Sequence, residues 1–235
     1  MFEITEGTYL GELVDKNPIA SKVLLRYGLD FCCGGQRSLS KACKDSDVDI
    51  DQILQELKVN QCISVNQLWA NASNDDLIAH ILDHYHASLY ENLPHLEELL
   101  KRVIQNHLDK DTERLTALKN EFSSFSEELL DHMAKEEQVL FPWILNNQGP
   151  SPVGPIQCMR IDHDRAGHSL ELIYTLTEGY KAPDQACITW RNLFAGLEKL
   201  DNELRMHIHL ENNILFPRFM EEELTPNHPI NLKAT

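Results

Sequence analysis

Two stretches of eleven residues decide the fold: HMAKEEQVLFP at residues 132–142 and HIHLENNILFP at residues 207–217. Both have the form H-x-x-x-E-x-x-x-L-F-P, so the second repeats the first. A histidine, His86, stands 46 residues before the first copy, and another, His163, stands 44 residues before the second. Because the spacing repeats along with the motif, the sequence predicts two related halves and a site on the approximate two-fold axis between them.

Each copy places its histidine and its glutamate on one face of a helix. Residues four apart share a face, so His132 can act with Glu136 and His207 with Glu211. A single His-x-x-x-Glu is usually an exposed pair, and the duplication argues against that reading here. Apolar residues extend these faces: Phe125, Leu129, Val139 and Trp143 beside His132, Leu200, Leu204 and Ile214 beside His207, Ile156, Leu170 and Tyr174 beside His163, and Ala79, Tyr90 and Leu93 beside His86.

Carboxylates in an apolar core are very costly unless positive charge compensates them, and a pair of metal ions supplies that charge. Two carboxylates able to bridge, with four imidazoles, suit iron or manganese, whereas structural zinc more often uses cysteine in a closed site of four ligands. The order and spacing also differ from the Glu-x-x-His motif of ferritin-type bundles. We therefore predict an iron site with six ligands: His86, His132, Glu136, His163, His207 and Glu211.

Helical periodicity dominates the chain, and strand signals are weak. The capping residue Ser73 begins the first of four long helices, which are expected at about 74–106, 112–145, 156–178 and 184–222. Because short loops join them, they predict an all-α fold with an antiparallel four-helix bundle over residues 75–224. Pro142 and Pro217 lie inside these helices and predict matching kinks or breaks just beyond the site.

Residues 1–60 predict a small helical domain, with short helices at about 19–27, 39–44 and 49–58, and a polar linker follows over 61–74. In this domain Cys32 and Cys33 stand in a glycine-rich turn. Vicinal cysteines seldom form a comfortable disulfide with each other. The turn therefore predicts exposed thiolates for a metal or for redox exchange. The alternative is two small buried residues at a helix junction.

The other histidines and cysteines lack a partner in the repeat. His209 is two residues from His207, which predicts an exposed side chain on the opposite face. For His107, at the end of the first long helix, the sequence allows two roles, a helix cap or an iron ligand. The remainder are expected at the surface, in loose segments or as packing residues: His80, His84, His95, His168, His228, Cys43, Cys62, Cys158 and Cys187.

Composition limits the partners. A formal net charge of −16 argues against nucleic acid and anionic membranes as general partners. No run approaches the roughly 20 apolar residues that cross a bilayer. The start, MFEITEG, lacks the features of a secretory signal. Six scattered cysteines suit a reducing compartment. We therefore expect a cytoplasmic protein.

In combination, the motifs resemble a known family. The segments DFCCGG (30–35), Tyr85-His86, GPIQCMRIDH (154–163) and both copies of the repeat are similar to the repair-of-iron-centres proteins of the YtfE and ScdA type. The resemblance implies an ScdA-type N-terminal domain and a hemerythrin-like bundle with an oxo-bridged pair of iron ions. The same six residues would be ligands, with Glu136 and Glu211 bridging the irons. It also implies a cytoplasmic role in restoring iron–sulfur clusters damaged by nitric oxide or oxidants, with iron–sulfur proteins as clients.

The residues allow three activities at such a site. The first is iron donation or the handling of nitric oxide in cluster repair. The second is a hemerythrin-like module that binds or senses dioxygen or nitric oxide, and the third is a nitric oxide reductase. The same ligands serve all three, so whether the protein is an enzyme stays open at this point, as do its clients, its electron donor and a homodimeric state.

Overall fold

The computed structural model describes residues 4–17, 19–59, 67–107, 111–146 and 152–220. Within these ranges the regular elements are all helical, and Tyr9 and Ser38 form an isolated β-bridge. The all-α fold class is therefore confirmed. None of the helices in this part of the chain combines the length and apolar character that spanning a membrane requires. Cys62 and His228 lie outside the described residues.

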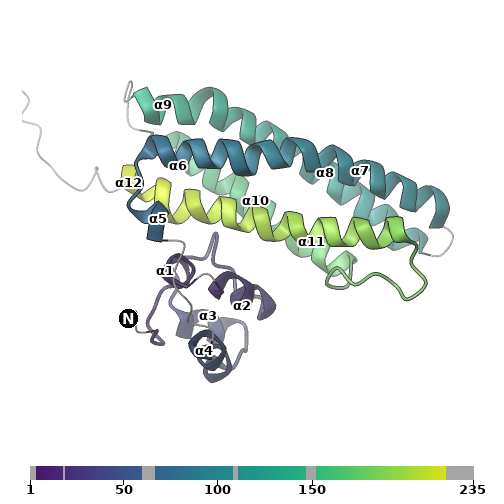
Figure 1. Ribbon diagram of the computed structural model, residues 1–235, viewed down its shortest axis with the longest axis horizontal. Coiled ribbons are helices and arrows are strands. Elements are labelled where there is room, and N and C mark those ends of the chain that lie inside the picture. Colours follow the sequence, from purple (N-terminus) through teal and green to yellow (C-terminus); the bar gives the residue numbers. More distant parts are fainter. Residues whose placement is uncertain (1–3, 18, 60–66, 108–110, 147–151, 221–235) are drawn as a thin grey trace, which may run out of the picture.

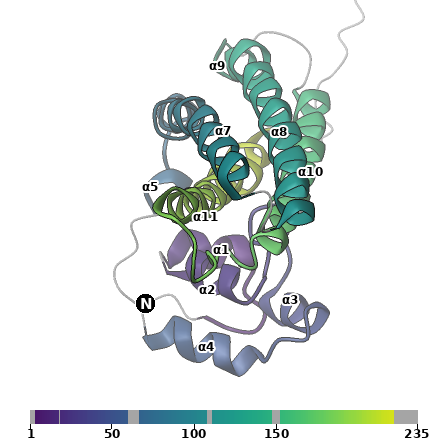
Figure 2. The same cartoon turned by 90° about the vertical axis from the view of Figure 1, so that its right-hand side faces the viewer.

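Four long helical arms form the bundle, and Figures 1 and 2 show them side by side. Arm α8 packs against α10, and α7 packs against both α11 and α8. The arms consist of α6 (Asn74–His80), η1 (Ile81–His86) and α7 (Ala87–His107); α8 (Thr112–Lys135), η3 (Glu136–Leu140) and α9 (Phe141–Asn146); α10 (Val153–Leu176); and α11 (Ile188–His209), η4 (Leu210–Leu215) and α12 (Pro217–Met220).

Local sequence signals account for the beginning of the first arm. The Ser73 hydroxyl accepts the backbone N–H of Asp76 at 3.1 Å, which is the expected N-cap. Along α7 the leucines recur at helical spacing on the side that faces the other arms, and Leu93, Leu96 and Leu100 are buried. Each such side chain contributes roughly 1.5–3 kcal/mol by leaving water. Packing of these apolar faces holds the arms together.

Three arms contain a wide π-helical turn, and these turns overturn part of the sequence prediction. In each turn a backbone N–H bonds to the carbonyl five residues earlier, as Phe216 does to Glu211 at 2.8 Å. The turn holds one extra residue, so the buried face shifts by one position. Val139 was predicted to be buried but is 55% exposed, and Leu140 is buried in its place.

In the first arm the wide turn η1 shifts the buried face by one position in the same way. Ala79 was expected on the inner face and is exposed, whereas its neighbour Ile78 is buried. Tyr90 and Tyr174 were also expected to face inward, and they are 44% and 54% exposed. Tyrosine can keep its hydroxyl in water while its ring covers apolar surface, so its place at the edge of a stripe is a weak sign of burial.

The two prolines behave differently. Pro142 is the second residue of α9 and directly follows the wide turn η3, so the helix continues and the predicted break is absent. The wide turn takes its place, because a proline without an N–H is easier to fit where the regular hydrogen-bond pattern already changes. Pro217 begins α12 after a turn at Phe216, which is the break that the sequence predicts.

A small helical domain packs beneath the bundle, with α1 and α2 nearest α11 in both views (Figures 1 and 2). Apolar side chains of this domain and of the bundle form one continuous core, which explains how the domain stays in place. The sequence predicted α2, α3 and α4 but missed α1 and the short α5. The elements are α1 (Leu10–Lys16), α2 (Ala20–Arg26), α3 (Leu39–Asp45), α4 (Ile50–Val59) and, in the expected linker, α5 (Gln67–Ala70).

Candidate metal centre

The six predicted side chains converge in the interior of the bundle. Their exposed fractions are all 3% or less. They form two groups, and within each group the candidate ligand atoms lie within 4.8 Å of one another. Both glutamates belong to both groups, as a pair of metal positions with shared carboxylates requires. Position A comprises His86, His207, Glu136 and Glu211, and position B comprises His132, His163, Glu136 and Glu211.

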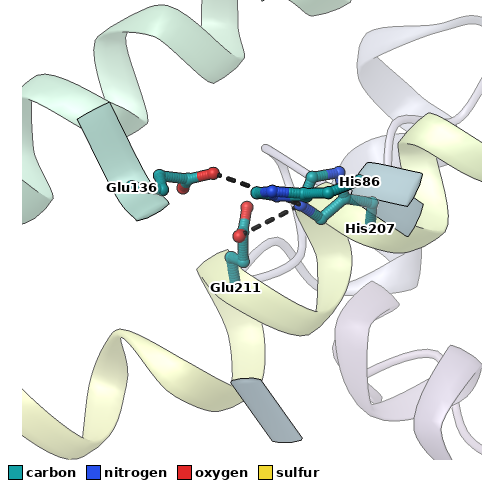
Figure 3. A group of neighbouring side chains, drawn as sticks. All are labelled: His86, Glu136, His207 and Glu211. Carbon is teal, nitrogen blue, oxygen red and sulfur yellow. Dashed lines mark hydrogen bonds and ion pairs between the residues drawn. The ribbon is translucent and has the colours of Figure 1, made fainter. Parts of the chain in front are cut away.

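At position A, shown in Figure 3, imidazoles from two arms meet the two carboxylates. Glu136 Oε2 lies 3.4 Å from His86 Nε2, and Glu211 Oε1 lies 3.1 Å from His207 Nε2. The two Nε2 atoms are 3.2 Å apart. The lone pairs of both rings and both carboxylates therefore point to one small volume.

Position B has the same arrangement with the other oxygen of each glutamate. Glu136 Oε1 lies 3.4 Å from His132 Nε2, and Glu211 Oε2 lies 3.1 Å from His163 Nε2. The two Nε2 atoms are 3.1 Å apart. Each carboxylate thus offers one oxygen to each position, which is the geometry of a bridging ligand.

Unsatisfied polar atoms show that these residues suit a cation. Both carboxylate oxygens of Glu136 and Oε2 of Glu211 are buried without a hydrogen-bond partner. A buried carboxylate is strongly unfavourable without compensating charge, and a metal pair would supply it. The donors are imidazole nitrogen and carboxylate oxygen with no thiolate, a set that suits iron.

Imidazole protons balance the carboxylates when metal is absent. Burial lowers the pKa of His132, but Glu136 and Glu211 outweigh it and raise the pKa to about 9. Burial raises the pKa of Glu211, but His207 and His163 outweigh it and hold the pKa well below its usual value. A metal must displace such protons, so its affinity should fall as the pH falls.

The outer nitrogens of two histidines are held by the residue that follows each motif glutamate. His86 Nδ1 donates to Glu137 at 2.8 Å, and His163 Nδ1 bonds to Asn212 Oδ1 at 3.0 Å. Such contacts orient Nε2 toward the metal. Sequence reasoning missed both partners, although the repeat carried a signal, since each stands five residues after the histidine of its own copy.

A cavity of about 210 Å³ leads to position B between α8, α10 and α11. Its lining includes His132, His163 and His207 but not His86. Apolar side chains form its inner wall, and charged ones such as Lys135 and Arg165 lie among the lining residues. Molecules of the size of dioxygen or nitric oxide can therefore approach the centre from the side of position B.

The double-cysteine turn is organised by one carboxylate. Asp30 accepts the backbone N–H groups of Cys32, Cys33 and Gly34 at 2.9, 3.1 and 3.0 Å. Cys32 is 1% exposed, which contradicts the expected exposed thiolate and fits the alternative of a small buried residue. The neighbouring Cys33 thiol, burial and Asp30 all raise the pKa of Cys32. Cys33 is half-buried, so it is the more available thiol.

Asp30, Cys32 and Cys33 also form a third group that could hold a metal ion. All five cysteines in the described residues are free thiols, including Cys43, Cys158 and Cys187. Cys43 is buried, as a packing residue would be, whereas Cys158 is exposed. The turn is therefore the place where two thiols and a carboxylate lie together.

Outside the six candidate ligands, the structure overturns the prediction for His209 and excludes one of the two roles left open for His107. His209 was expected to be exposed but is fully buried, because the N-terminal domain covers that face and Asp15 accepts its Nε2–H at 2.8 Å. His107 belongs to neither metal position, since its Nε2 lies 3.2 Å from the Cys187 sulfur. His80 is half-buried against Trp69, with the ring centroids 4.1 Å apart. Three others are exposed, His84 and His95 as predicted and also His168.

Comparison with known proteins agrees with this arrangement. Residues 77–219 match the hemerythrin HHE cation binding domain, and residues 6–61 match ScdA_N, a domain of unknown function. The chain is 40% identical over 215 residues to the iron-sulfur cluster repair protein YtfE of Pectobacterium atrosepticum, covering 91% of this chain and 97% of the relative. The proteins of the same name from Salmonella schwarzengrund and Escherichia coli O81 are 39% and 38% identical, with the same coverage.

Proposed function

This chain belongs to the family of hemerythrin-type iron–sulfur cluster repair proteins, and we propose that it repairs iron–sulfur clusters damaged by nitric oxide or oxidants. The observation that carries the proposal is the pair of metal positions that share two fully buried carboxylates. The function for which the relatives are named supports it, since the similarity extends over nearly the whole length of both chains.

In this proposal the centre would hold a pair of iron ions, with an oxo bridge expected between them. His86 and His207 would hold the iron at position A, His132 and His163 would hold the iron at position B, and Glu136 and Glu211 would offer one oxygen to each. When bound, the iron pair supplies reversible change between ferrous and ferric states and affinity for small diatomic ligands. The residues fix the geometry, and the buried surroundings keep bulk water from the ligand atoms.

Iron itself is the cargo in the repair reaction. Two anionic carboxylates favour the higher charge of ferric ions, so reduction to the ferrous state weakens the hold on the metal. An iron lost from position B can leave through the cavity that reaches His132 and His163. The recipients are client proteins with damaged clusters, and we place the reaction in the cytoplasm because the six scattered cysteines of the sequence suit a reducing compartment.

A reconstitution experiment tests this function. Purified protein with two irons per chain is mixed with a client enzyme whose cluster has been nitrosylated, and recovery of the client's activity is measured. We expect recovery with the wild-type protein and none with the double variant Glu136→Leu, Glu211→Leu. If the wild-type protein carries two irons and leaves the client inactive, iron donation is wrong.

The cavity at position B favours a second candidate function, the binding or reduction of nitric oxide or dioxygen. Reversible optical changes on adding the gas to the diferrous protein would indicate a binding or sensing module. Multiple-turnover production of nitrous oxide would indicate a nitric oxide reductase. A single stoichiometric event, followed by iron loss, would instead favour the repair function.

A further inference from the structure

One buried side chain connects position B with the double-cysteine turn. Asn212 lies in the wide turn η4, directly after the bridging Glu211, and is 9% exposed. Its Oδ1 meets His163 Nδ1 at 3.0 Å. Its Nδ2 donates to the Cys32 carbonyl at 3.3 Å and contacts the Cys33 sulfur at 3.9 Å. The metal centre and the thiols thus contact opposite ends of the same amide.

The contacts fix the orientation of that amide. The Cys32 carbonyl can only accept a hydrogen bond, so the NH₂ end of Asn212 must face the cysteine turn. The oxygen end then faces His163 and can only accept, which requires the proton on Nδ1. His163 Nε2 is left with its lone pair directed toward position B. One side chain therefore sets the tautomer of a candidate ligand and the surroundings of the Cys33 thiol.

We propose that Asn212 is a positioning residue that couples metal occupancy at position B to the reactivity of Cys33. The proposal rests on the metal centre proposed above. A cation on Nε2 draws electron density from the imidazole ring and makes Nδ1–H a stronger donor. The amide that accepts this bond becomes polarised, and its N–H groups become stronger donors toward the cysteine turn. The contact from Asn212 Nδ2 to the Cys33 sulfur is strengthened as a result.

Coupling of this kind works in both directions. Metal at position B and the contact between Asn212 and Cys33 stabilise each other by the same factor, so a modification of Cys33 that breaks this contact lowers the affinity of position B. A thiol that has reacted with an electrophile would thereby favour release of the neighbouring iron. Among the described residues position A shows no such connection, because His86 Nδ1 bonds to Glu137, which also accepts from Tyr90, and His207 Nδ1 has no hydrogen-bond partner.

The adjacent Asn213 supplies a matched control. Its Nδ2 donates to the carbonyls of Phe31 and Cys32 at 3.3 and 3.0 Å and lies 3.2 Å from His209. It holds the same turn against the same helix but contacts none of the six candidate ligands. Asn213→Ala should loosen the turn and leave the connection from position B to Cys33 intact.

The first experiment measures the rate at which iodoacetamide alkylates Cys33, followed by mass spectrometry, before and after anaerobic loading with ferrous iron. In the wild type we expect loading with iron to accelerate the alkylation of Cys33 about fivefold, which is the low end of the range for coupled sites. Asn212→Asp keeps an acceptor for His163 but loses the donor, so it should bind iron and lose the acceleration. Asn213→Ala should retain it.

Several results would overturn the proposal. The proposal is wrong if Cys33 is alkylated at the same rate in iron-loaded and metal-free wild-type protein. It is also wrong if iron accelerates the alkylation of the Asn212→Asp variant as much as that of the wild type. The double variant Glu136→Leu, Glu211→Leu checks for iron bound at the cysteines themselves. If iron changes its Cys33 rate as well, the effect does not come from position B and the proposal is wrong.

The second experiment measures iron release to a chromogenic chelator, which should show two phases. Asn212→Leu removes both ends of the connection and should accelerate one phase about 10–100-fold, the usual effect of losing a partner of a metal-bound histidine. The other phase should not change. Equal acceleration of both phases would indicate general loosening and contradict the proposal. Failure of the wild type to bind iron would refute the metal centre, whereas normal binding without coupling would refute only this inference.

Discussion

Positions A and B share two bridging carboxylates and the same arrangement of rings, yet their outer contacts differ. At position A the outer nitrogen of His86 bonds to the carboxylate of Glu137 at 2.8 Å. At position B the equivalent nitrogen of His163 bonds to the neutral amide of Asn212 at 3.0 Å. A carboxylate makes the histidine a more basic ligand than an amide does. The repeated motif thus builds a site whose two metal positions are chemically unequal.

The two metal positions also differ in how far the cavity reaches them, and position B is the more accessible one. The cavity between α8, α10 and α11 reaches both histidines of position B but only His207 of position A. The ring of Tyr85 stacks on His207, with the centroids 5.4 Å apart. We therefore expect the iron at position B to be the more exchangeable one, and the following experiments test that difference.

The largest expected effect comes from removing both carboxylates that the two metal positions share. Glu136→Leu with Glu211→Leu abolishes the difference between the positions, because neither retains a carboxylate. We expect iron content to fall from two per chain to nearly none, measured by metal analysis and Mössbauer spectroscopy. The metal-free variant should melt no lower than the metal-free wild type, since leucine replaces a costly buried charge. A full complement of iron would refute the assigned ligands.

Exchanging the residues that bond to the outer histidine nitrogens should reduce or reverse the difference between positions A and B in their rates of iron release. Glu137→Gln weakens the support of His86, and we expect about a tenfold loss of affinity at position A alone. Asn212→Asp gives His163 a carboxylate and should slow release from position B. Chelator-release kinetics on each variant measure both effects. Two phases that do not respond separately to the two substitutions would show that the outer partners do not distinguish the positions.

A smaller effect is expected at Gly35, which allows the cysteine turn to reach η4. A Cβ at this residue would lie 2.1 Å from Asn213 Oδ1 and 2.7 Å from the Phe31 carbonyl. Gly35→Ala must push the turn away, and we expect it to cost about 1–3 kcal/mol of stability. Thermal melting measures this cost. Iron content should stay at two per chain, and a loss of iron from position A would contradict the separation of the positions.

The smallest effect is expected from Tyr90→Phe. The Tyr90 hydroxyl donates to Glu137 at 3.2 Å at the surface, and an exposed hydrogen bond of this kind contributes on the order of 0.5–1 kcal/mol or less. Release from position A should accelerate by less than about fivefold, whereas release from position B should not change. Stopped-flow measurements with the chelator can resolve this, with Tyr174→Phe, at a tyrosine on α10 that contacts no candidate ligand, as the control.

The sequence predicted which six residues meet because the repeat encoded them twice. It could not predict which neighbours were buried beside them. The exposure of Val139 depends on the extra residue in a wide turn, and a search for regular helical spacing assumes that no such residue exists. The burial of His209 depends on a domain that begins almost two hundred residues earlier, and residues on one helix carry no sign of such a distant contact.

The outer partners were missed for a different reason. Glu137 and Asn212 are ordinary polar residues on an exposed-looking side of the motif, and nothing in their type distinguishes a support for histidine from a solvated side chain. Comparing the two copies would have found their common place after the glutamate. It would not have found the difference in their roles, which depends on Asn212 facing the cysteine turn.

The wide turns have a consequence for how this protein can change length. Each turn resembles an α-helix into which one residue has been inserted, so deleting one residue would restore ordinary helix. Deleting Val139 would leave Phe141 and Ile144 four and seven residues after Glu136, the spacing that keeps them on one face of an ordinary α-helix. A substitution at Val139 touches only the surface, and its deletion would turn η3 into ordinary helix while the buried face of α9 keeps its direction. The wide turn therefore lets the motif differ by one residue in length without turning the packed residues that follow it away from the core.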